Sequence, residues 1–227
     1  VYKSQVVIGG NIGKNTTTSN ENADADYIQN FETLHPYIDY FVLNVSCPNV
    51  SNFTKLQDVE FLKKLVPQLK KINSTKPKKK PILIKISPDL TLTDIKIIAD
   101  LSLQFGIDGI IATNTTLTRE NLLSRNKDED GGLSGRPLFE RSNQILAQFS
   151  YETEGKLPLI GVGGISSAKD AFVKIKAGAS IIQLYSAITY NGFSLIEKIF
   201  YELDDIIKKE GFTHISEAVG IEKEHWL

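Results

Sequence analysis

The sequence contains no methionine, although it is 227 residues long. A translated protein starts with methionine, and a core of this size normally uses a few more as gap-filling side chains. We therefore expect the sequence to be a fragment of a longer protein, with the N-terminus outside it. A single cysteine excludes a disulfide framework and favours a reducing compartment.

Strong net charge and long apolar runs are also absent. The formal net charge is -1 and the pI is about 6.4, so no overall field draws the chain to nucleic acid or to an anionic membrane. No apolar run approaches the roughly 20 residues that a membrane-spanning helix needs. The basic run at residues 76–80 (KPKKK) lacks interleaved aromatic residues, so we expect a solvated loop there and no nucleic-acid site. His35, His214 and His225 lack the spacing of metal ligands, and no metal site is expected.

Short β-branched runs alternate with amphipathic stretches along the whole chain. The runs predict strands at residues 5–10, 40–45, 82–86, 109–113, 159–163 and 180–185. The stretches between them predict helices at about 24–34, 58–72, 93–105, 137–149, 167–177 and 194–209. Thr93 and Ser167 fit N-caps, Pro137 fits a first turn, and Gly106 and Gly178 fit C-terminal stops. Nearly continuous apolar strands indicate a parallel α/β sheet covered on both faces.

Two parallel architectures compete, an open doubly wound sheet and a closed (β/α)8 barrel of the TIM type. The segment GGNIG lacks the third glycine of a dinucleotide-binding turn, which disfavours the first. Polar residues follow the end of every strand, which favours the barrel, because its strand ends share one face where active sites form. These residues are Asn11, Asn44, Cys47, Asn49, Lys85, Thr113, Asn114, Gly163, Gly164, Tyr185 and Ser186. A barrel needs eight strands, so we expect residues 1–227 to supply strands three to eight of one domain.

Several of these strand ends indicate chemistry. The segments IGVGGIS and QLYS resemble the paired loops that bind phosphate in barrels, with Gly164 and Ser186 as donors, although tight turns alone also use glycine. Lys85 and Asn44 lie inside apolar strands, where each needs an anion, an acceptor or an amide partner. Lys85 could therefore form a structural salt bridge or face an anionic cofactor ring. The polar residues 124–130 are a candidate lid.

Cys47 lies where a strand ends in a loop, beside Pro48 and among polar residues. A lone cysteine is usually a small apolar side chain, but a thiol whose pKa is near 8.5 can act as a base when a partner lowers it. No histidine lies nearby in the sequence to form a nucleophilic pair. Proton abstraction is therefore favoured over acyl transfer.

The motifs NIGKN, NVSCPN, IKISPDL, DGIIATNTT, GGLSGRPL, IGVGGI and QLYS follow one another in an order and spacing that resembles dihydroorotate dehydrogenase. The resemblance runs from about residue 7 to residue 220. GGLSGRPL, IATNTT, GVGGI and the tail EGFTHISEAVG most resemble the class 2 branch, which is membrane-associated and reduces quinone. The resemblance implies FMN-dependent oxidation of dihydroorotate to orotate in de novo pyrimidine (UMP) biosynthesis. It also implies a peripheral location at the bacterial or mitochondrial inner membrane.

The same resemblance implies a role for each matched residue. The residues implied to contact FMN are Asn11, Asn44, Lys85, Thr113, Gly135, Gly164, Tyr185 and Ser186. Among them Lys85 would lie at the flavin N1/O2 edge, and the last three with Gly135 would hold the phosphate end. The residues implied to bind substrate are Asn44, Asn49, Asn114 and Thr115. Cys47 falls at the catalytic base, which removes the C5 proton of dihydroorotate while the C6 hydride passes to flavin N5.

Two features depart from the class 2 pattern. Class 2 enzymes usually have serine at the position of Cys47, whereas cysteine is typical of the soluble class 1 branch. The segment PNVSNFTKLQ also replaces the glycine-bearing PNTPGL pattern. The alternatives are a class 1-like enzyme or related flavin barrel that uses fumarate or NAD, and an inactive fragment. The resemblance further implies that two earlier strands supply a substrate-binding lysine, and that preceding helices form the quinone tunnel and the membrane attachment.

Overall fold

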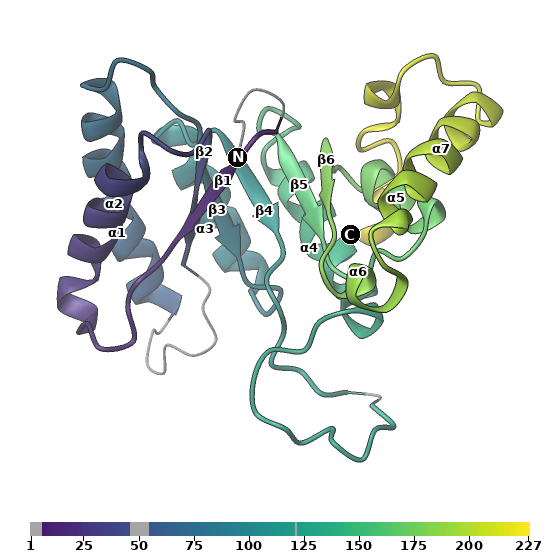
Figure 1. Cartoon of the computed structure of the whole chain (residues 1–227), viewed down its shortest axis with the longest axis horizontal. Helices are drawn as coiled ribbons and strands as arrows, with labels where there is room; N and C mark the ends of the chain where they lie inside the picture. Colours follow the sequence, from purple (N-terminus) through teal and green to yellow (C-terminus); the bar gives the residue numbers. More distant parts are fainter. Residues whose placement is uncertain (1–5, 46–54, 121) are drawn as a thin grey trace.

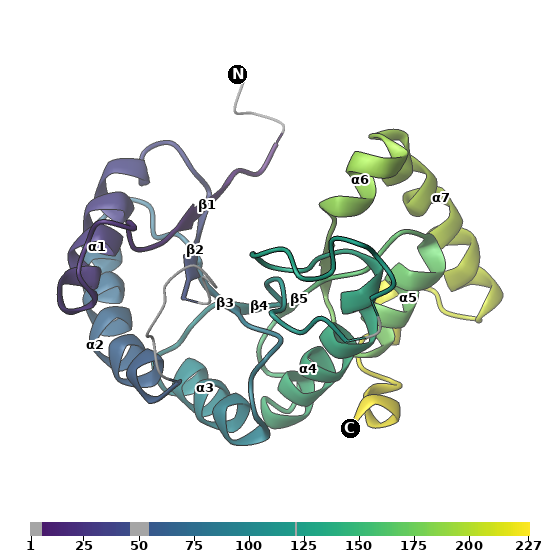
Figure 2. The ribbon, with the colours of Figure 1, turned by 90° about the horizontal axis from the view of Figure 1, so that it is seen from below.

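A computed structural model describes residues 6–45, 55–120 and 122–227 (Figure 1). One parallel sheet contains, in spatial as well as chain order, β1 (Gly9–Ile12), β2 (Tyr40–Asn44), β3 (Ile82–Ile86), β4 (Gly109–Ala112), β5 (Leu159–Val162) and β6 (Ile181–Gln183). A doubly wound sheet reverses its strand order at a switch point. The unbroken order excludes that architecture, and the sheet curls into a partial barrel as predicted (Figure 2).

The helices follow the strands and cover the outer, convex side of the sheet (Figure 2). They are α1 (Ala23–Leu34), α2 (Lys55–Ser74), α3 (Leu92–Gln104), α4 (Phe139–Glu152), α5 (Ala168–Lys176), α6 (Ser186–Asn191) and α7 (Ser194–Lys209). Short 3-10 helices are η1 (Asn20–Asn22), η2 (Arg136–Leu138), η3 (Ile215–Ala218) and η4 (Lys223–Trp226). No described helix has the length and apolar character needed to cross a membrane.

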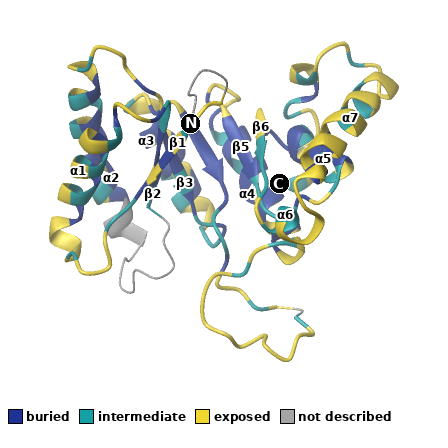
Figure 3. Ribbon diagram, in the orientation of Figure 1, coloured by how far each residue is buried: buried dark blue, intermediate teal, exposed yellow. Residues whose placement is uncertain are grey.

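Strand alternation divides the apolar side chains between two cores. Outward-facing residues such as Phe41, Leu43 and Ile84 pack with the helices in the main core. Inward-facing Val42, Leu83, Ile111 and Ile160 form a second cluster inside the curl. Because both faces are buried, the central strands read as continuous apolar runs, and Figure 3 shows them dark blue.

The two edge strands differ from the prediction. The first strand begins at Gly9 and extends to Ile12, so the β-branched residues Val6 and Val7 precede it and are 64% and 74% exposed. The last strand is only three residues long, and its Ile181 is 58% exposed. The two strands exist as predicted, but the predicted bounds are wrong, and the last strand is not buried on both faces as expected. Among the described residues β6 pairs with β5 alone, so its other edge has no strand partner.

Helix ends follow local hydrogen-bonding chemistry. The N-cap of α3 is Thr91, so the prediction of Thr93 is wrong. Thr91 Oγ1 accepts a hydrogen bond from the Asp94 N–H (3.3 Å), and the Asp94 carboxylate accepts one from the Thr91 N–H (2.9 Å). The predicted cap Ser167 is confirmed at the start of α5, where Oγ accepts from the Asp170 N–H at 3.1 Å. Gly106 and Gly178 follow α3 and α5 as predicted.

The predicted solvated loop at residues 76–80 is wrong at its last residue. Lys80 is 7% exposed, and its ammonium donates hydrogen bonds to the carbonyl oxygens of His35 and Ile38. Asn73 near the end of α2 holds the Lys80 backbone by donating to its carbonyl oxygen (2.8 Å) and accepting from its N–H (3.0 Å). A buried ammonium that fills carbonyl acceptors at a loop is a structural group. One lysine of the basic run therefore joins two loops.

The C-terminal segment returns to the outer surface of the barrel. The N–H groups of Gly220 and Glu222 donate to the carbonyl oxygens of Ile175 and Lys176 at the end of α5, each at 3.0 Å. The Lys176 ammonium pairs with the Glu222 carboxylate at 2.6 Å. Trp226 in η4 then packs against the main core beside α4. These contacts attach residues 220–226 to the outer surface formed by α4 and α5.

Candidate active site

A cavity of about 420 Å³ lies where β3 to β6 end on the inner side of the curl. It collects most of the predicted site residues from separate loops, as expected when parallel strands end at one face. The predicted residues that line it are Lys85, Thr113, Asn114, Thr115, Gly135, Gly164, Tyr185 and Ser186. Their roles stay predictions, but the sequence correctly identified residues that the fold brings together.

Strand register places the inner polar side chains beside one another. Asn44 at the end of β2 pairs in register with Lys85 on β3, and the Asn114 Nδ2 lies 3.4 Å from the Asn44 Oδ1. Asn11 pairs with the inward-facing Val42, so it belongs to the inner face of β1. Asn11 and Asn44 are outside the cavity lining itself. They continue its polar surface toward the first strand.

Two cationic side chains, Lys85 and Arg136, line the cavity, and Lys85 is the one that a strand supplies. It lies between the buried residues Ile84 and Ile86, and burial lowers the pKa of its ammonium from the ordinary 10.5. Burial disfavours a charged group, and an anion placed nearby would favour it. The position therefore suits an anionic or electron-rich group in the cavity.

Backbone and side-chain hydrogen bonds hold the loop after β4 in place. The Asn114 N–H donates to the Ile86 carbonyl oxygen at 2.7 Å, and the Asn114 Oδ1 accepts from the Thr115 N–H at 2.9 Å. The Thr116 hydroxyl donates to the Asp89 carboxylate at 2.5 Å, which ties this loop to the loop after β3. Asn114 is therefore held in one orientation, with its amide nitrogen directed toward Asn44.

The opposite end of the cavity is formed by turns that contain glycine. Gly164 has a φ of +72°, and a Cβ there would lie 2.5 Å from the Phe139 Cβ, so both conformation and space require glycine. The Ser134 and Ser186 hydroxyls are 2.8 Å apart and join the loop before η2 to the start of α6. Within the described part of the chain, the Gly164 N–H donates to no acceptor. This end can therefore bind an anion through the backbone.

A long loop between β4 and η2 projects beyond the strand ends (Figure 1). A β-bridge between Thr116 and Leu133 closes its base. The Arg119 guanidinium donates to the carbonyl oxygens of Thr116 (3.1 Å), Glu129 (3.3 Å) and Gly131. The predicted lid, residues 124–130, forms the exposed tip of this hydrogen-bonded loop. Its action as a lid stays a prediction.

Sequence reasoning missed six polar residues that line the cavity, namely Ser134, Arg136, Ser166, Gln183, Tyr190 and Asn191. Strand alternation could have found Gln183, because it lies two residues before Tyr185 on β6. Cys47 and Asn49, predicted as base and substrate ligand, lie outside the described residues. Across the residues that the structure describes, no cluster of three or more His, Cys, Asp or Glu side chains fits a metal ion.

Comparisons with known proteins identify the family. The family model for dihydroorotate dehydrogenase matches residues 2–207. A relative from Christiangramia forsetii, described as dihydroorotate dehydrogenase (quinone), is 50% identical over 194 residues, covering 86% of this chain and 57% of the relative. A protein of the same description from Cereibacter sphaeroides is 42% identical over 225 residues, covering 99% of this chain and 63% of that protein.

A solved structure agrees with these relatives. The crystal structure of DHODH from Eimeria tenella in complex with ferulenol matches with a TM-score of 0.90 and 32% identity, covering 97% of this chain and 63% of that one. The chain therefore spans about three fifths of the length of the proteins it matches. A family model that covers most of the chain, together with curated relatives and a shared fold, leads to one conclusion. This chain belongs to the dihydroorotate dehydrogenase family.

Proposed function

We propose that this chain is the FMN-binding part of a quinone-dependent dihydroorotate dehydrogenase that converts dihydroorotate to orotate. The observation that carries the proposal is one continuous cavity that joins Lys85 to the glycine turns at Gly135 and Gly164. A cation at one end and backbone donors at the other match a group with an electron-rich ring and a phosphate. The curated relatives are described as quinone enzymes, which favours quinone over fumarate or NAD.

The residues present fit FMN by the chemistry of their donors. Lys85 would hold the ring through its ammonium, with Thr113 in the same cavity. Asn44 would contact the ring from the adjacent strand β2, and Asn11 from β1, one strand further along the sheet. The phosphate would lie at the second end of the cavity, against the residues Gly135, Gly164, Tyr185 and Ser186. When bound, FMN supplies the hydride acceptor that amino-acid side chains lack.

Substrate would lie against the amide side chains beside Lys85. Asn44 and Asn114 present amide groups 3.4 Å apart at the ends of β2 and β4, and Thr115 lies next to them. We assign Asn49 to the same shell and Cys47 to the base that takes the C5 proton. A thiol can serve as a base when neighbouring groups lower its pKa.

The rest of the enzyme would complete this chain. A (β/α)8 barrel has eight strands, and the chain provides six of them. We propose that the two remaining units pair with β1 and β6 and bring the substrate-binding lysine. Helices before them would form the quinone tunnel and attach the protein to the inner membrane of bacteria or mitochondria.

The proposal is tested with the full-length protein that contains this chain. The purified protein should carry FMN and oxidise dihydroorotate with a soluble quinone much faster than with fumarate or NAD. Oxidation with fumarate or NAD at the higher rate would move the protein to the class 1-like alternative. A protein without flavin, or with flavin that dihydroorotate does not reduce, would refute the proposal.

Cys47→Ala tests the base. The variant should keep its FMN and lose at least about a hundredfold in the rate at which dihydroorotate reduces the flavin, the lower end of the usual contribution of a general base. Cys47→Ser should keep part of the activity with an altered pH profile, because a hydroxyl has a much higher pKa than a thiol. Rapid mixing without oxygen measures this step directly. A wild-type rate in Cys47→Ala would show that another group removes the proton.

A further inference from the structure

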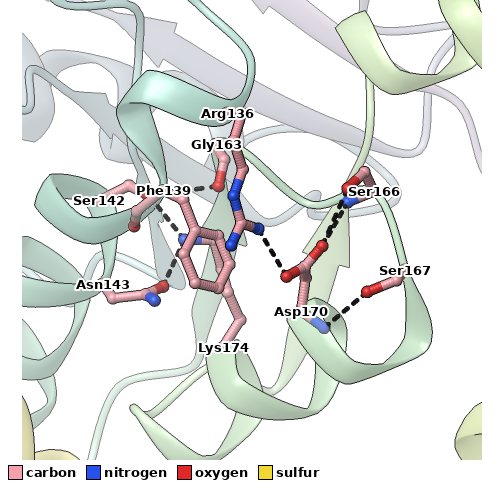
Figure 4. Close-up of polar contacts among 9 residues, drawn as sticks. All are labelled: Arg136, Phe139, Ser142, Asn143, Gly163, Ser166, Ser167, Asp170 and Lys174. Atoms are coloured by element: carbon pink, nitrogen blue, oxygen red, sulfur yellow. Dashed lines mark hydrogen bonds and ion pairs between the residues drawn. The ribbon is translucent and has the colours of Figure 1, made fainter. Parts of the chain in front are cut away.

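A fully buried lysine lies directly behind the glycine turn at the phosphate end of the cavity (Figure 4). Lys174 on α5 is 0% exposed, and its ammonium donates hydrogen bonds to the Ser142 Oγ (2.6 Å) and the Asn143 Oδ1 (2.7 Å) on α4. The ammonium also lies 5.3 Å from the centre of the Phe139 ring. Within the described chain, no carboxylate lies within 4.0 Å of this ammonium.

The surroundings accommodate a cation. Asn143 is 0% exposed and directs its only side-chain acceptor at Lys174, while its Nδ2 has no hydrogen-bond partner within the described structure. Gly161 on β5 makes room for the lysine stem, because a Cβ at that position would lie 2.7 Å from the Lys174 Cδ. An apolar side chain would need none of these hydrogen bonds, and a buried lysine is unfavourable unless its charge is compensated. Compensation from an anion would explain the arrangement.

A hydrogen-bonded chain links Lys174 to the turn. The Ser142 Oγ accepts from Lys174, and its single hydrogen is shared between the carbonyl oxygens of Phe139 (2.9 Å) and Gly163 (3.3 Å). The C=O and N–H groups of a trans peptide point in opposite directions. With its carbonyl group directed at Ser142, the peptide between Gly163 and Gly164 directs its N–H away from Ser142, toward the cavity that both glycines line.

Burial and nearby charged groups act in opposite directions on the pKa of Lys174. Burial lowers the pKa of Lys174 to about 7, and the carboxylates of Asp170 and Glu140 oppose that decrease. Asp170 is itself paired with Arg136, whose guanidinium lies 2.7 Å away and stacks on the same Phe139 ring. An anion bound in front of the turn would favour the ammonium form, because opposite charges stabilise each other in a site shielded from water.

We propose that Lys174 is a positioning residue for the phosphate of the bound flavin, a role that rests on the FMN site proposed above. It acts without contacting the ligand. Through Ser142 it fixes the Gly163–Gly164 peptide with the N–H toward the phosphate, and its positive charge lies behind that N–H. A neutral side chain at this position would remove both the positive charge and the hydrogen bond to Ser142, and would therefore weaken the affinity of the turn for a dianion.

The test compares FMN with riboflavin, which has the same ring system and no phosphate. In the full-length protein, Lys174→Met keeps the length of the side chain and removes the charge. We expect its dissociation constant for FMN to rise about tenfold or more, whereas that for riboflavin changes less than about twofold. The matched control is Lys169→Met on the exposed side of α5, which should change neither constant.

A second variant keeps the proposal testable if Lys174→Met does not fold. Ser142→Ala keeps the lysine and removes the link to Gly163, and it should raise the FMN constant by about threefold to tenfold with riboflavin again unchanged. Equal losses for FMN and riboflavin in the folded variants would overturn the proposal, because Lys174 would then only support packing. If Lys174→Met fails to fold, Ser142→Ala decides. A wild-type protein that binds neither flavin would instead overturn the FMN site itself, and this inference with it.

Discussion

Lys174 makes the stability of this protein depend on pH. Its pKa is about 7 in the folded chain, against 10.5 for the unperturbed side chain, so between these values the unfolded chain binds more protons. The free energy of unfolding should therefore rise with pH across this window. At pH 7 and below, the folded state bears most or all of the cost of burying the charge, and above pH 10.5 it bears none.

The prediction is that Lys174→Met removes this dependence. In the FMN-free protein, the free energy of unfolding of the wild type minus that of the variant should increase by a few kcal/mol from pH 7 to pH 10. One pKa unit corresponds to about 1.4 kcal/mol. Urea unfolding of both proteins at several pH values measures the difference, with Lys169→Met as the control. A difference that stays constant with pH would contradict the assigned titration.

Which site residues could be predicted depended on where they lie in the sequence. Lys85, Thr113 and Gly164 were identifiable because a polar residue or glycine at the end of an apolar strand is conspicuous. Lys174 was not, because it lies among the alternating charges of an amphipathic helix and reads as a solvated side chain. Its burial depends on the space left at Gly161, which only the packing of α5 on β5 reveals.

The start of α3 provides a direct comparison of two threonines two residues apart. Thr91→Ala removes the capping box with Asp94 and should lower the free energy of unfolding by about 1 kcal/mol, as is typical of N-caps. Thr93→Ala, inside the first turn and exposed, should leave stability unchanged or slightly higher because alanine has the better helix propensity. Urea unfolding of the full-length variants checks both. Equal losses in the two variants would mean that the capping box contributes nothing.

At the level of elements, hydrophobic periodicity predicted each strand that the structure describes and each described α-helix except α6, but not the short 3-10 helices as separate elements. It could not find their ends, because ends depend on partners far away in the sequence. Val6 and Val7 look like strand residues, yet the Ile8 N–H donates to the Asp39 carboxylate (2.8 Å) and the regular pairing begins at Gly9. The six-residue α6 is too short to show a helical period.

The whole molecule has an apolar surface near the open edge of the barrel. Several large side chains on β6, α6 and α7 and in the segments between them are more than half exposed, namely Ile181, Tyr185, Tyr190, Phe193, Phe200 and Tyr201. On a monomeric protein, so many exposed apolar groups in one region indicate a surface that another segment covers. The proposed first two βα units would be that segment. The sequence did not predict this exposed apolar surface, because an amphipathic pattern does not show whether another part of the protein covers the apolar face.

We predict that the 227 residues expressed alone neither fold stably nor retain FMN. The uncovered edge should bind a hydrophobic dye such as ANS and cause association, and heating should give no cooperative transition. The full-length protein is the control and should bind little dye, hold flavin and melt cooperatively. A yellow, monomeric fragment that melts cooperatively would contradict this prediction.

The return of the C-terminal segment to the barrel wall gives the protein an internal optical reporter. Trp226 is the only tryptophan of the chain, and it packs beside α4, the helix that carries Ser142 and Asn143. Its indole fluorescence is therefore sensitive to a shift of α4, and the His225 ring lies edge-on to the indole at 5.6 Å. A change in Trp226 fluorescence would therefore report a movement of α4, which lies behind the turn at Gly163.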